Sequence, residues 1–543
     1  MKAHIVDIVN KKIFDGEIII KDGFIEEIRE VKDLPKDSPY IMPGFVDSHI
    51  HIESTMLLPE HYAEVAVKMG VVSAIADPHE IANVLGMDGI EYMINNGKKV
   101  RFGFHFGASS CVPSTCFETS GSTLNSEAVK KLLQKEEIYG LSEMMNVPGV
   151  LFKDPEVMAK IQSAIEINKP IDGHAPGTSG DNLKQYVEAG ISTDHECSEL
   201  ADAEERIKLG MMIQIREGSA ARNYDKLCPL IQEYPNSTMF CSDDKEPEDL
   251  QLGYINELVK ASIKKGYSLW NVLQTACVNP VKHYKICNGL LQKGDKADFI
   301  IVNNLQDFEV QSTFIDGIEV YSKSYDCLDN LIKDKTIETN YPNKFNAKPI
   351  KTSDLKINST NEDIKVIVAY DGEILTDEKI FKSKVIDNNI VSDIEKDVMK
   401  MVVYNRYTEA KPAIAFINGF TLKKGALAST VAHDSHNIIA IGTSDEEIVK
   451  VINEIIRLKG GMVVSDGAKI ETLPLPVAGL MSGDKCEKVA YDFEKLKKVA
   501  KECGCKFNAP FMTMAFMALP VIPKLKLTDL GLFDGVKFEF TKL

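Results

Sequence analysis

Several features that mark secreted, membrane-bound or nucleic-acid-binding chains are missing from this 543-residue sequence. No uninterrupted apolar run is long enough to span a bilayer, and the N-terminus has no long apolar segment of the kind found in signal peptides. The net charge of -17, without a basic stripe, argues against a nucleic-acid partner. The 11 cysteines are scattered and odd in number, which indicates free thiols. We therefore expect a cytoplasmic protein that binds neither membranes nor nucleic acids.

The composition is that of an ordinary soluble globular protein, with 44% hydrophobic and 26% charged residues. The length is sufficient for several domains, or for one large barrel with additions. Function therefore has to be inferred from motifs rather than from composition.

One stretch predicts a strand that carries two histidines on one face. The segment after the tight Pro43-Gly44 pair is largely apolar, which is typical of a β-strand. Residues two apart on a strand point to the same face, so His49 and His51 present two imidazoles side by side. Neutral imidazoles on a rigid strand suit a divalent metal such as zinc, manganese or iron. A His-x-His pair also occurs by chance on surface strands, so the rest of the chain must decide.

Short apolar runs alternate with helical stretches between residues 41 and 285. This alternation and this length are typical of an α/β fold, a (β/α)₈ TIM-like barrel. The eight predicted strands are residues 44–52, 71–78, 101–109, 138–145, 170–175, 191–197, 211–217 and 238–244.

Histidines and carboxylates are concentrated at the carboxyl ends of these strands, where barrels of this kind place their chemistry. Four of the 11 histidines stand at the ends of the first, fifth and sixth strands. With the carboxylates that end the fourth and eighth strands they are enough for two cations, with Glu143 between them. The predicted metal ligands are His49, His51, Glu143, His174, His195 and Asp243.

The segments outside the barrel predict further units. Residues 1–40 and 286–325 alternate apolar and polar and predict a small β-sandwich, with hairpin turns at Asp15-Gly16 and Asp22-Gly23. Residues 326–364 are polar and predict a connector. Residues 365–543 predict a C-terminal α+β domain, in which a capping box at 444–447 begins a helix that stops at Gly460.

Five motifs resemble the bacterial and archaeal adenine deaminases of the amidohydrolase superfamily, and the resemblance covers nearly the whole chain. The resemblance implies hydrolytic deamination of adenine to hypoxanthine and ammonia in purine salvage or catabolism. It also implies a binuclear site, for which Mn²⁺ is the expected ion and Fe²⁺ or Zn²⁺ are alternatives. We expect a homodimer or higher homo-oligomer. The motifs are residues 45–56, 76–83, 141–146, 172–177 and 428–437.

This chain has Glu143 where commoner binuclear relatives use a carboxylated lysine, and a mononuclear site stays an alternative. We expect Asp243 to be the catalytic residue that takes a proton from the attacking water and delivers it to the leaving amine. The ring-protonating residue is left open among four glutamates, and residues 108–118 are expected near the base. The candidate substrate-binding residues are Glu53, His79, Glu80, Glu118, Glu196, Asp244, His433 and His436.

Two other functions stay open at this point. A cyclic amidase of the dihydroorotase or hydantoinase type uses the same metal-dependent barrel. A non-catalytic scaffold of the dihydropyrimidinase-like type would have lost metal ligands that this chain retains. The polar run 428–437 is either a turn or a segment that covers the barrel mouth.

Overall fold

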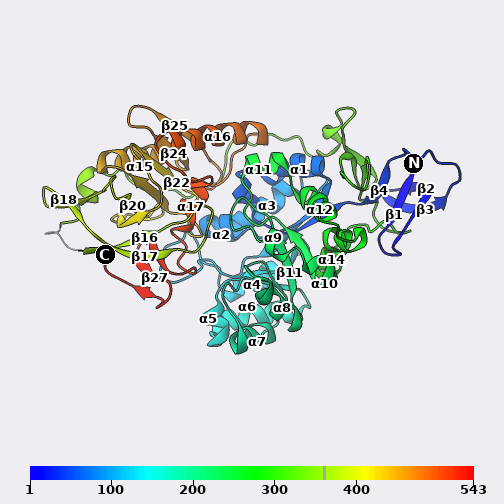
Figure 1. Cartoon of the computed structure of the whole chain (residues 1–543), viewed down its shortest axis with the longest axis horizontal. Helices are drawn as coiled ribbons and strands as arrows, with labels where there is room; N and C mark the ends of the chain where they lie inside the picture. Colours follow the sequence, from blue (N-terminus) through cyan, green and yellow to red (C-terminus); the bar gives the residue numbers. More distant parts are fainter. Residues whose placement is uncertain (359–362) are drawn as a thin grey trace.

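The computed structural model of the chain describes residues 1–358 and 363–543. The predicted connector at 326–364 includes residues 359–362, which lie outside the described residues. The first β segments lie at one end of the long axis, the C-terminal third lies at the other end, and the residues between them form the middle (Figure 1). In the described part of the chain, no helix has both the length and the apolarity needed to cross a membrane.

The middle of the molecule contains eight parallel strands, in one sheet of five and one sheet of three. Each lies inside one of the eight predicted ranges. The strands are buried, as the apolar runs predict for a parallel sheet that is covered on both faces. They are β5 (Phe45–Ile50), β6 (Val71–Ala76), β7 (Gly103–Ala108), β8 (Ile138–Met144), β9 (Ile171–Gly173), β10 (Thr193–Asp194), β11 (Met212–Arg216) and β12 (Thr238–Cys241).

Backbone hydrogen bonds join the two sheets at both edges. The amide of Asp243, just after β12, donates to the carbonyl of His49 over 2.9 Å. The amide of Ser192, just before β10, donates to the carbonyl of Ile171 in β9, also over 2.9 Å. The fold is therefore the expected (β/α)₈ barrel, and the carboxyl ends of its strands meet at one mouth.

Helices connect consecutive strands of the barrel. In α6 (Pro155–Glu166) the Asp154 carboxylate caps the first turn by accepting from the amides of Glu156 and Val157. The other helices between strands are α1 (Pro59–Ala66), α2 (His79–Leu85), α3 (Met87–Gly97), α4 (Ser126–Leu133), α5 (Val147–Leu151), α7 (Gly180–Glu188), α8 (Leu200–Lys208), α9 (Tyr224–Leu227) and α10 (Leu230–Glu233). After β12 come α11 (Pro247–Leu252), α12 (Ile255–Lys264), α13 (Leu269–Leu273) and α14 (Asn279–Tyr284).

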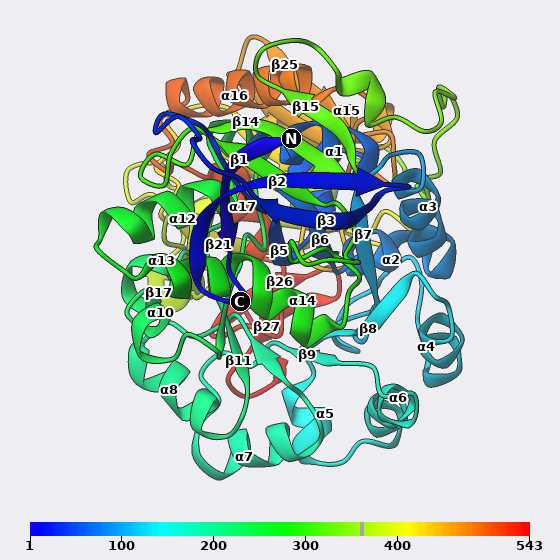
Figure 2. The same cartoon turned by 90° about the vertical axis from the view of Figure 1, so that its right-hand side faces the viewer.

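The segments before and after the barrel form one seven-stranded sheet, which faces the viewer in Figure 2. The pairing of β4 with β13 joins the two segments. The predicted turn at Asp22-Gly23 is present between β2 and β3. The sheet order is β15 (Ile318–Ser322), β14 (Val310–Ile315), β13 (Phe299–Val302), β4 (Tyr40–Pro43), β1 (Lys2–Asp7), β2 (Lys12–Lys21) and β3 (Phe24–Glu30).

The predicted turn at Asp15-Gly16 is wrong, because both residues lie inside β2. Gly16 pairs with Ala3 of β1 and with Glu30 of β3. A Cβ atom on Gly16 would lie 2.5 Å from a side-chain carbon of Ile5. Glycine at this position allows close packing of the strands and does not form a turn. The local sequence alone cannot distinguish these two roles of a glycine.

The C-terminal third contains an eight-stranded sheet with helices packed on it. The N-cap of the predicted capping box is present, since the Ser444 hydroxyl accepts from the Glu447 amide at the start of α15 (Asp445–Leu458). The Glu447 carboxylate instead accepts from the Ser465 hydroxyl. The sheet order is β17 (Asp377–Lys382), β16 (Asp363–Val368), β21 (Ala413–Asn418), β20 (Met399–Tyr404), β23 (Ile438–Gly442), β22 (Ala426–Ser429), β24 (Gly461–Ser465) and β25 (Ile470–Pro474). Further elements are α16 (Cys486–Glu502), α17 (Pro510–Phe516), β18 (Lys384–Ile386), β19 (Asn389–Val391), β26 (Leu525–Thr528), β27 (Gly531–Asp534) and β28 (Glu539–Phe540).

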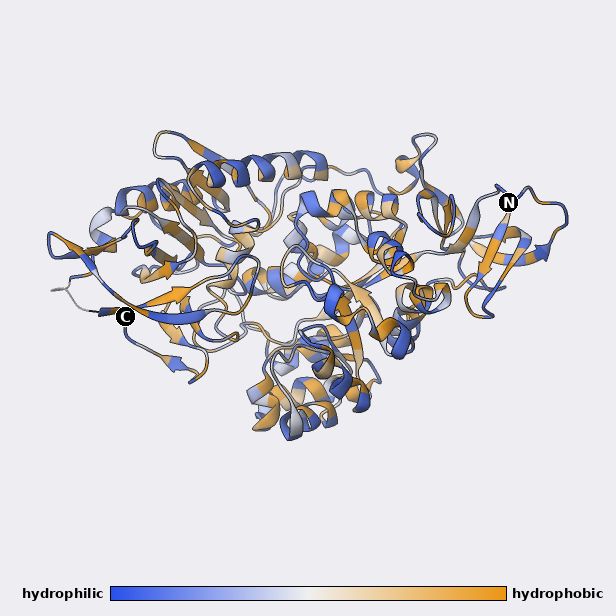
Figure 3. Cartoon of the chain, viewed as in Figure 1, coloured by the Kyte–Doolittle hydropathy of each residue, from blue (hydrophilic) through white to orange (hydrophobic). Residues whose placement is uncertain are grey.

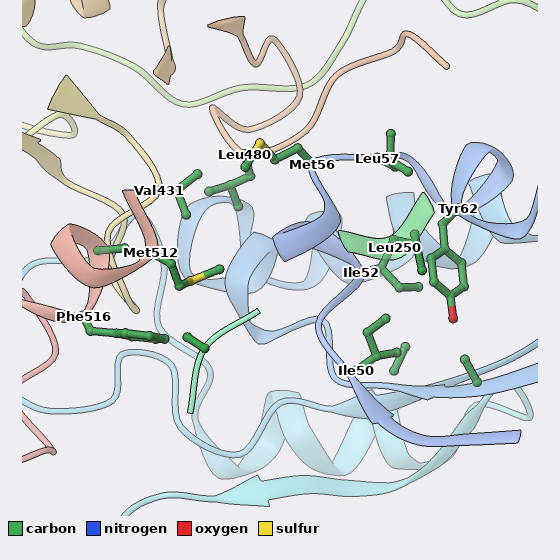
Figure 4. Close-up of a cluster of buried hydrophobic side chains, with 14 of the residues drawn as sticks. Ile50, Ile52, Met56, Leu57, Tyr62, Leu250, Val431, Leu480, Met512 and Phe516 are labelled. Carbon is green, nitrogen blue, oxygen red and sulfur yellow. The ribbon is translucent and has the colours of Figure 1, made fainter. Parts of the chain in front are cut away.

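The C-terminal third packs directly on the barrel. The amide of Ser482 donates to the carbonyl of Met56 over 2.8 Å. Apolar side chains of both parts gather there, including Val431, Met512 and Phe516 (Figure 4). The strands of both parts are mainly apolar, whereas polar residues mark many outward helix surfaces (Figure 3). One continuous core therefore fixes the C-terminal third over the barrel.

Candidate active site

His49 of β5 and His51, just after β5, meet the carboxylate that follows β12. His51 Nε2 lies 3.1 Å from Asp243 Oδ1, and His49 Nε2 lies 3.6 Å from the same oxygen. The backbone of Asp243 is left-handed, with φ of 56°, a conformation that costs free energy for a residue other than glycine. The surrounding hydrogen bonds hold this strained residue, as is common at functional sites.

Glu143, at the end of β8, lies between two groups of imidazoles. Its Oε1 lies 3.4 Å from His51 Nε2. Its Oε2 lies 3.0 Å from His174 Nδ1 and 3.2 Å from His195 Nε2. The structure thus brings all six predicted metal ligands into one buried cluster.

The donor set fits divalent cations. Among the described residues, neither ring nitrogen of His49 has a hydrogen-bond partner, although the side chain is buried. Burial, together with the nearby His195, lowers the pKa of His49 to about 4, so its imidazole is neutral and able to ligate. Several overlapping sets of histidine and carboxylate atoms have the spacing that one ion requires. Nitrogen and carboxylate ligands together suit manganese, iron or zinc.

Arg216 is not among the predicted site residues, yet its positive charge favours the ionised form of the carboxylates beside it. Arg216, the last residue of β11, donates to Glu196 over 2.6 Å and to Asp243 over 2.5 Å. Burial opposes ionisation of Asp243, but Arg216, His49 and His51 outweigh it and hold the pKa of the Asp243 carboxyl well below its usual value. Burial likewise opposes ionisation of Glu143, and the imidazoles of His174 and His195 lower its pKa well below the usual value. Both carboxylates are therefore ionised.

A hydrogen-bond network beneath the cluster fixes β5. The Asp47 carboxylate accepts from the hydroxyls of Ser242 and Tyr254, each over 2.5 Å, and from the amide of His49 over 3.1 Å. These bonds tie β5 to the segment after β12, which carries Asp243. The relative placement of the histidines and Asp243 is therefore set by buried groups and not by the loop alone.

The cluster forms one wall of a cavity that is lined by residues of both the barrel and the C-terminal third. Barrel residues contribute its charged groups. The C-terminal third contributes a second set, which we call the roof: Ile374, His433, Asp434, Phe516, Leu519 and Ile522. The barrel residues of the lining are His51, His79, Glu80, Glu143, Met145, His174, His195, Glu196, Arg216, Ala221, Asp243 and Asp244.

Charged contacts fasten the roof to the barrel. Glu80, in the first turn of α2, lies 2.7 Å from His433 Nδ1 and also contacts His436 Nε2. Burial disfavours the charged form of His433, but Glu80 outweighs it and raises the pKa of His433 to about 9. The predicted run 428–437 therefore reaches the cavity and does not lie on an open surface.

The other candidate substrate-binding residues fall into two groups. His79, Glu80, Glu196, Asp244 and His433 line the cavity. Glu53, Glu118, His436 and residues 108–117 are not among the described residues that line it. Glu53 accepts from the amide of Ile81 in α2, and Glu118 accepts from Ser114 and Thr115 within its own loop.

Two kinds of cavity residue are missing from the prediction. Arg216 stands at the carboxyl end of a predicted strand, as the predicted histidines do. The same positional argument could therefore have identified it. Phe516, Leu519 and Ile522 reach the cavity only through packing of the C-terminal third, which no local pattern shows.

Residues 40–320 match the amidohydrolase family, and residues 373–539 match the adenine deaminase C-terminal domain. The sequence is 47% identical over 552 residues to the adenine deaminase of Methanosarcina mazei, covering 99% of this chain and 98% of that relative. The chain belongs to the adenine deaminase family. The adenine deaminase of Parabacteroides distasonis is 45% identical over 546 residues, with 100% of this chain and 98% of that relative covered. That of Sulfurovum sp. is 48% identical over 541 residues, with 99% and 98% covered.

The solved structures that resemble this adenine deaminase family member are more distant. A β-aspartyl dipeptidase from Fervidobacterium islandicum aligns with a TM-score of 0.46 at 17% identity, covering 62% of this chain and 98% of that chain. The L-hydantoinase (dihydropyrimidinase) from Arthrobacter aurescens aligns with a TM-score of 0.44 at 15% identity, covering 59% and 95%. Likenesses of this size carry no argument about the substrate.

Proposed function

We propose that this protein hydrolyses adenine to hypoxanthine and ammonia, in purine salvage or catabolism. The observation that carries the proposal is one cavity in which a metal-type cluster of the barrel meets a roof supplied by the adenine deaminase C-terminal domain. The full-length likeness to proteins named adenine deaminase supports it over a cyclic amidase or a scaffold.

His49, His51, Glu143, His174, His195 and Asp243 would hold two divalent cations, with Mn²⁺ the expected ion and Fe²⁺ or Zn²⁺ as alternatives. When bound, the cations would supply a water nucleophile that is activated at neutral pH. Glu143 has one oxygen directed to His51 and the other to His174 and His195, which supports a bridging role without any modified lysine.

Asp243 is the proposed proton carrier. As the water oxygen bonds to C6 of adenine, Asp243 takes the water proton. When the bond from C6 to the amine breaks, Asp243 gives that proton to the departing nitrogen, and ammonia leaves. The hydroxyl that remains on C6 releases its proton as the carbonyl forms, and this proton restores the group that protonated the ring. The ion pair with Arg216 keeps Asp243 ionised and ready to accept.

The purine ring nitrogen next to C6 must gain a proton as the water adds. Of the four glutamates considered, only Glu80 and Glu196 line the cavity in the described structure. Glu196 is paired with Arg216, which carries no proton that it can release at neutral pH. Glu80 is paired with His433, whose raised pKa keeps a proton at the cavity wall. We assign ring protonation to the Glu80–His433 pair.

The roof excludes water from the reaction. Phe516, Leu519 and Ile522 present apolar surface to the cavity, and the His433 ring stacks on Phe516 with centroids 5.1 Å apart. A dry cavity strengthens every charged contact with the base. The 11 cysteines are all free, which supports a reducing cytoplasm as the location, and we further propose a homodimer or higher homo-oligomer.

The test is direct. Protein loaded with Mn²⁺ is incubated with adenine, and ammonia and hypoxanthine are measured together. Equimolar release of the two products, absent after chelation of the metal, is expected. Ring opening of a dihydropyrimidine or hydantoin, without release of ammonia from adenine, would contradict the proposal and favour the cyclic amidase.

A further inference from the structure

Asp434, in the roof, is a buried carboxylate without a close partner. It lies between β22 and β23 and is 2% exposed. Its Oδ2 has no hydrogen-bond partner in residues 1–358 and 363–543. Its Oδ1 lies 3.8 Å from His79 Nε2 and 3.8 Å from His433 Nδ1, which is too far for a hydrogen bond. A buried carboxylate oxygen without a hydrogen bond costs free energy, so we expect a further group to donate to it.

The neighbouring groups are already used by other partners. Glu80 binds His433 with one oxygen and His436 with the other. His79 Nε2, the nitrogen that faces Asp434, lies closer to Glu80 Oε1, at 3.4 Å. The occupant of the cavity can therefore supply the donor that Asp434 lacks among the described residues.

The position of Asp434 separates it from the metal cluster. The His79 ring lies between Glu143, near its Nδ1, and Asp434, near its Nε2. Asp434 lines the same cavity as Phe516 and Leu519. A flat ligand whose reacting carbon lies at the metal cluster can therefore present another of its edges to Asp434.

We propose that Asp434 accepts a hydrogen bond from the imidazole N–H of the purine, and that it thereby selects free bases over purines substituted at N9. The inference rests on the proposed function. A free purine base carries one N–H on its imidazole ring, whichever of its two nitrogens holds the proton. A nucleoside has a sugar at N9 and no imidazole N–H, so it would leave the buried carboxylate unpaired.

A third cation is the alternative occupant, because His79, Glu80 and Asp434 have ligand atoms near one another. The contacts favour the N–H donor. Both oxygens of Glu80 already contact histidines of the roof, so a cation beside Asp434 would have to compete with those contacts.

Binding of hypoxanthine and 9-methylhypoxanthine to the metal-loaded protein tests the proposal. The wild-type protein should bind hypoxanthine at least about 10²-fold more tightly, because a site built for an N–H rejects the analogue that lacks it. In Asp434→Ala this ratio should fall about 10-fold or more, through weaker binding of hypoxanthine and unchanged or tighter binding of the methylated base. Asp434→Asn keeps the size and one acceptor oxygen, and should give an intermediate ratio.

Asp387→Asn, at an exposed turn of the same C-terminal third, is the matched control and should leave the ratio unchanged. A ratio in both Asp434 variants within twofold of wild type would overturn the proposal. Loss of one bound metal ion per chain in Asp434→Asn would overturn it in favour of the cation. Binding needs no turnover, so this result is separate from a failure of the protein to release ammonia from adenine.

Discussion

The barrel wall and the roof of the cavity are built in different ways. In the barrel wall the ionised groups compensate one another, with Glu143 among imidazoles and Asp243 held by Arg216. In the roof, apolar side chains line the cavity together with a carboxylate, Asp434, that has no hydrogen-bond partner on Oδ2 among the described residues. A wall whose charges are balanced is suited to hold cations and move protons. A roof with one unpaired acceptor is suited to exclude water and recognise a ligand.

Replacement of Asp243, the proposed proton carrier in the barrel wall, should have the largest effect. Asp243→Asn keeps the size and removes the proton acceptor, so kcat should fall about 10²–10⁴-fold while the metal is largely retained. Turnover of adenine and metal content per chain are the measurements. A near-normal kcat would assign the proton transfer to Asp244 or to another group.

The second change tests whether the charge balance of the barrel wall matters for catalysis. Arg216 lowers the pKa of Asp243, which must be ionised to act. Removing the guanidinium in Arg216→Met raises that pKa, so the acid limb of the kcat/KM profile should move to higher pH, with activity lost first at low pH. The pH profile of ammonia release is the measurement.

Arg206→Met is the matched control, because it breaks another buried ion pair, with Asp194, whose N–O distance is 2.7 Å. Each change should destabilise the fold by about 3–5 kcal/mol, since it leaves an unpaired buried charge. If both variants moved the acid limb equally, the shift would reflect general damage to the barrel.

A change in the contact between roof and barrel should have an intermediate effect. His436→Ala leaves an oxygen of Glu80 unpaired and loosens the segment that carries His433 and Asp434. Adenine turnover should fall about 10-fold, as for other groups that orient a site, with a smaller effect on unfolding. His283→Ala, on α14, is the control. If His436→Ala lowered turnover and the free energy of unfolding to the same extent, the role of His436 would be purely structural.

Much of the barrel and of its metal cluster could be predicted from the sequence. Strands of a covered parallel sheet are continuous apolar runs, and barrel chemistry lies at their carboxyl ends, so His49 and Glu143 could be found from local pattern alone. The roof could not be found in this way. Asp434 and Phe516 reach the cavity because the C-terminal third packs on the barrel, and that contact depends on tertiary structure. The prediction of a turn at Asp15-Gly16 is wrong for a similar reason, because Gly16 is required by packing against another strand and not by a local turn.

The smallest effect on turnover is expected from a lysine behind the roof. Lys526 is fully buried and donates to the carbonyls of Ile374 and Phe516 over 2.7 and 3.0 Å. Burial lowers the pKa of Lys526 from 10.5 to about 7. Between these values the unfolded chain binds a proton that the folded chain does not, so this lysine makes the folded state more stable as pH rises from 7 to 10.5.

Lys526→Met should therefore flatten the rise in unfolding free energy over that pH range, with little change in kcat. Chemical denaturation at several pH values is the measurement. An unchanged pH dependence would show that Lys526 keeps its proton in the folded protein.

The central claim is that the barrel wall holds two cations which adenine deamination requires. Titration of the metal-free protein with Mn²⁺, with ammonia release from adenine measured at each step, tests it most directly. Activity should reach its maximum at two ions per chain, and Glu143→Gln should lose the second ion together with the activity. Full activity at one ion per chain, or two tightly bound ions in Glu143→Gln, would contradict the account.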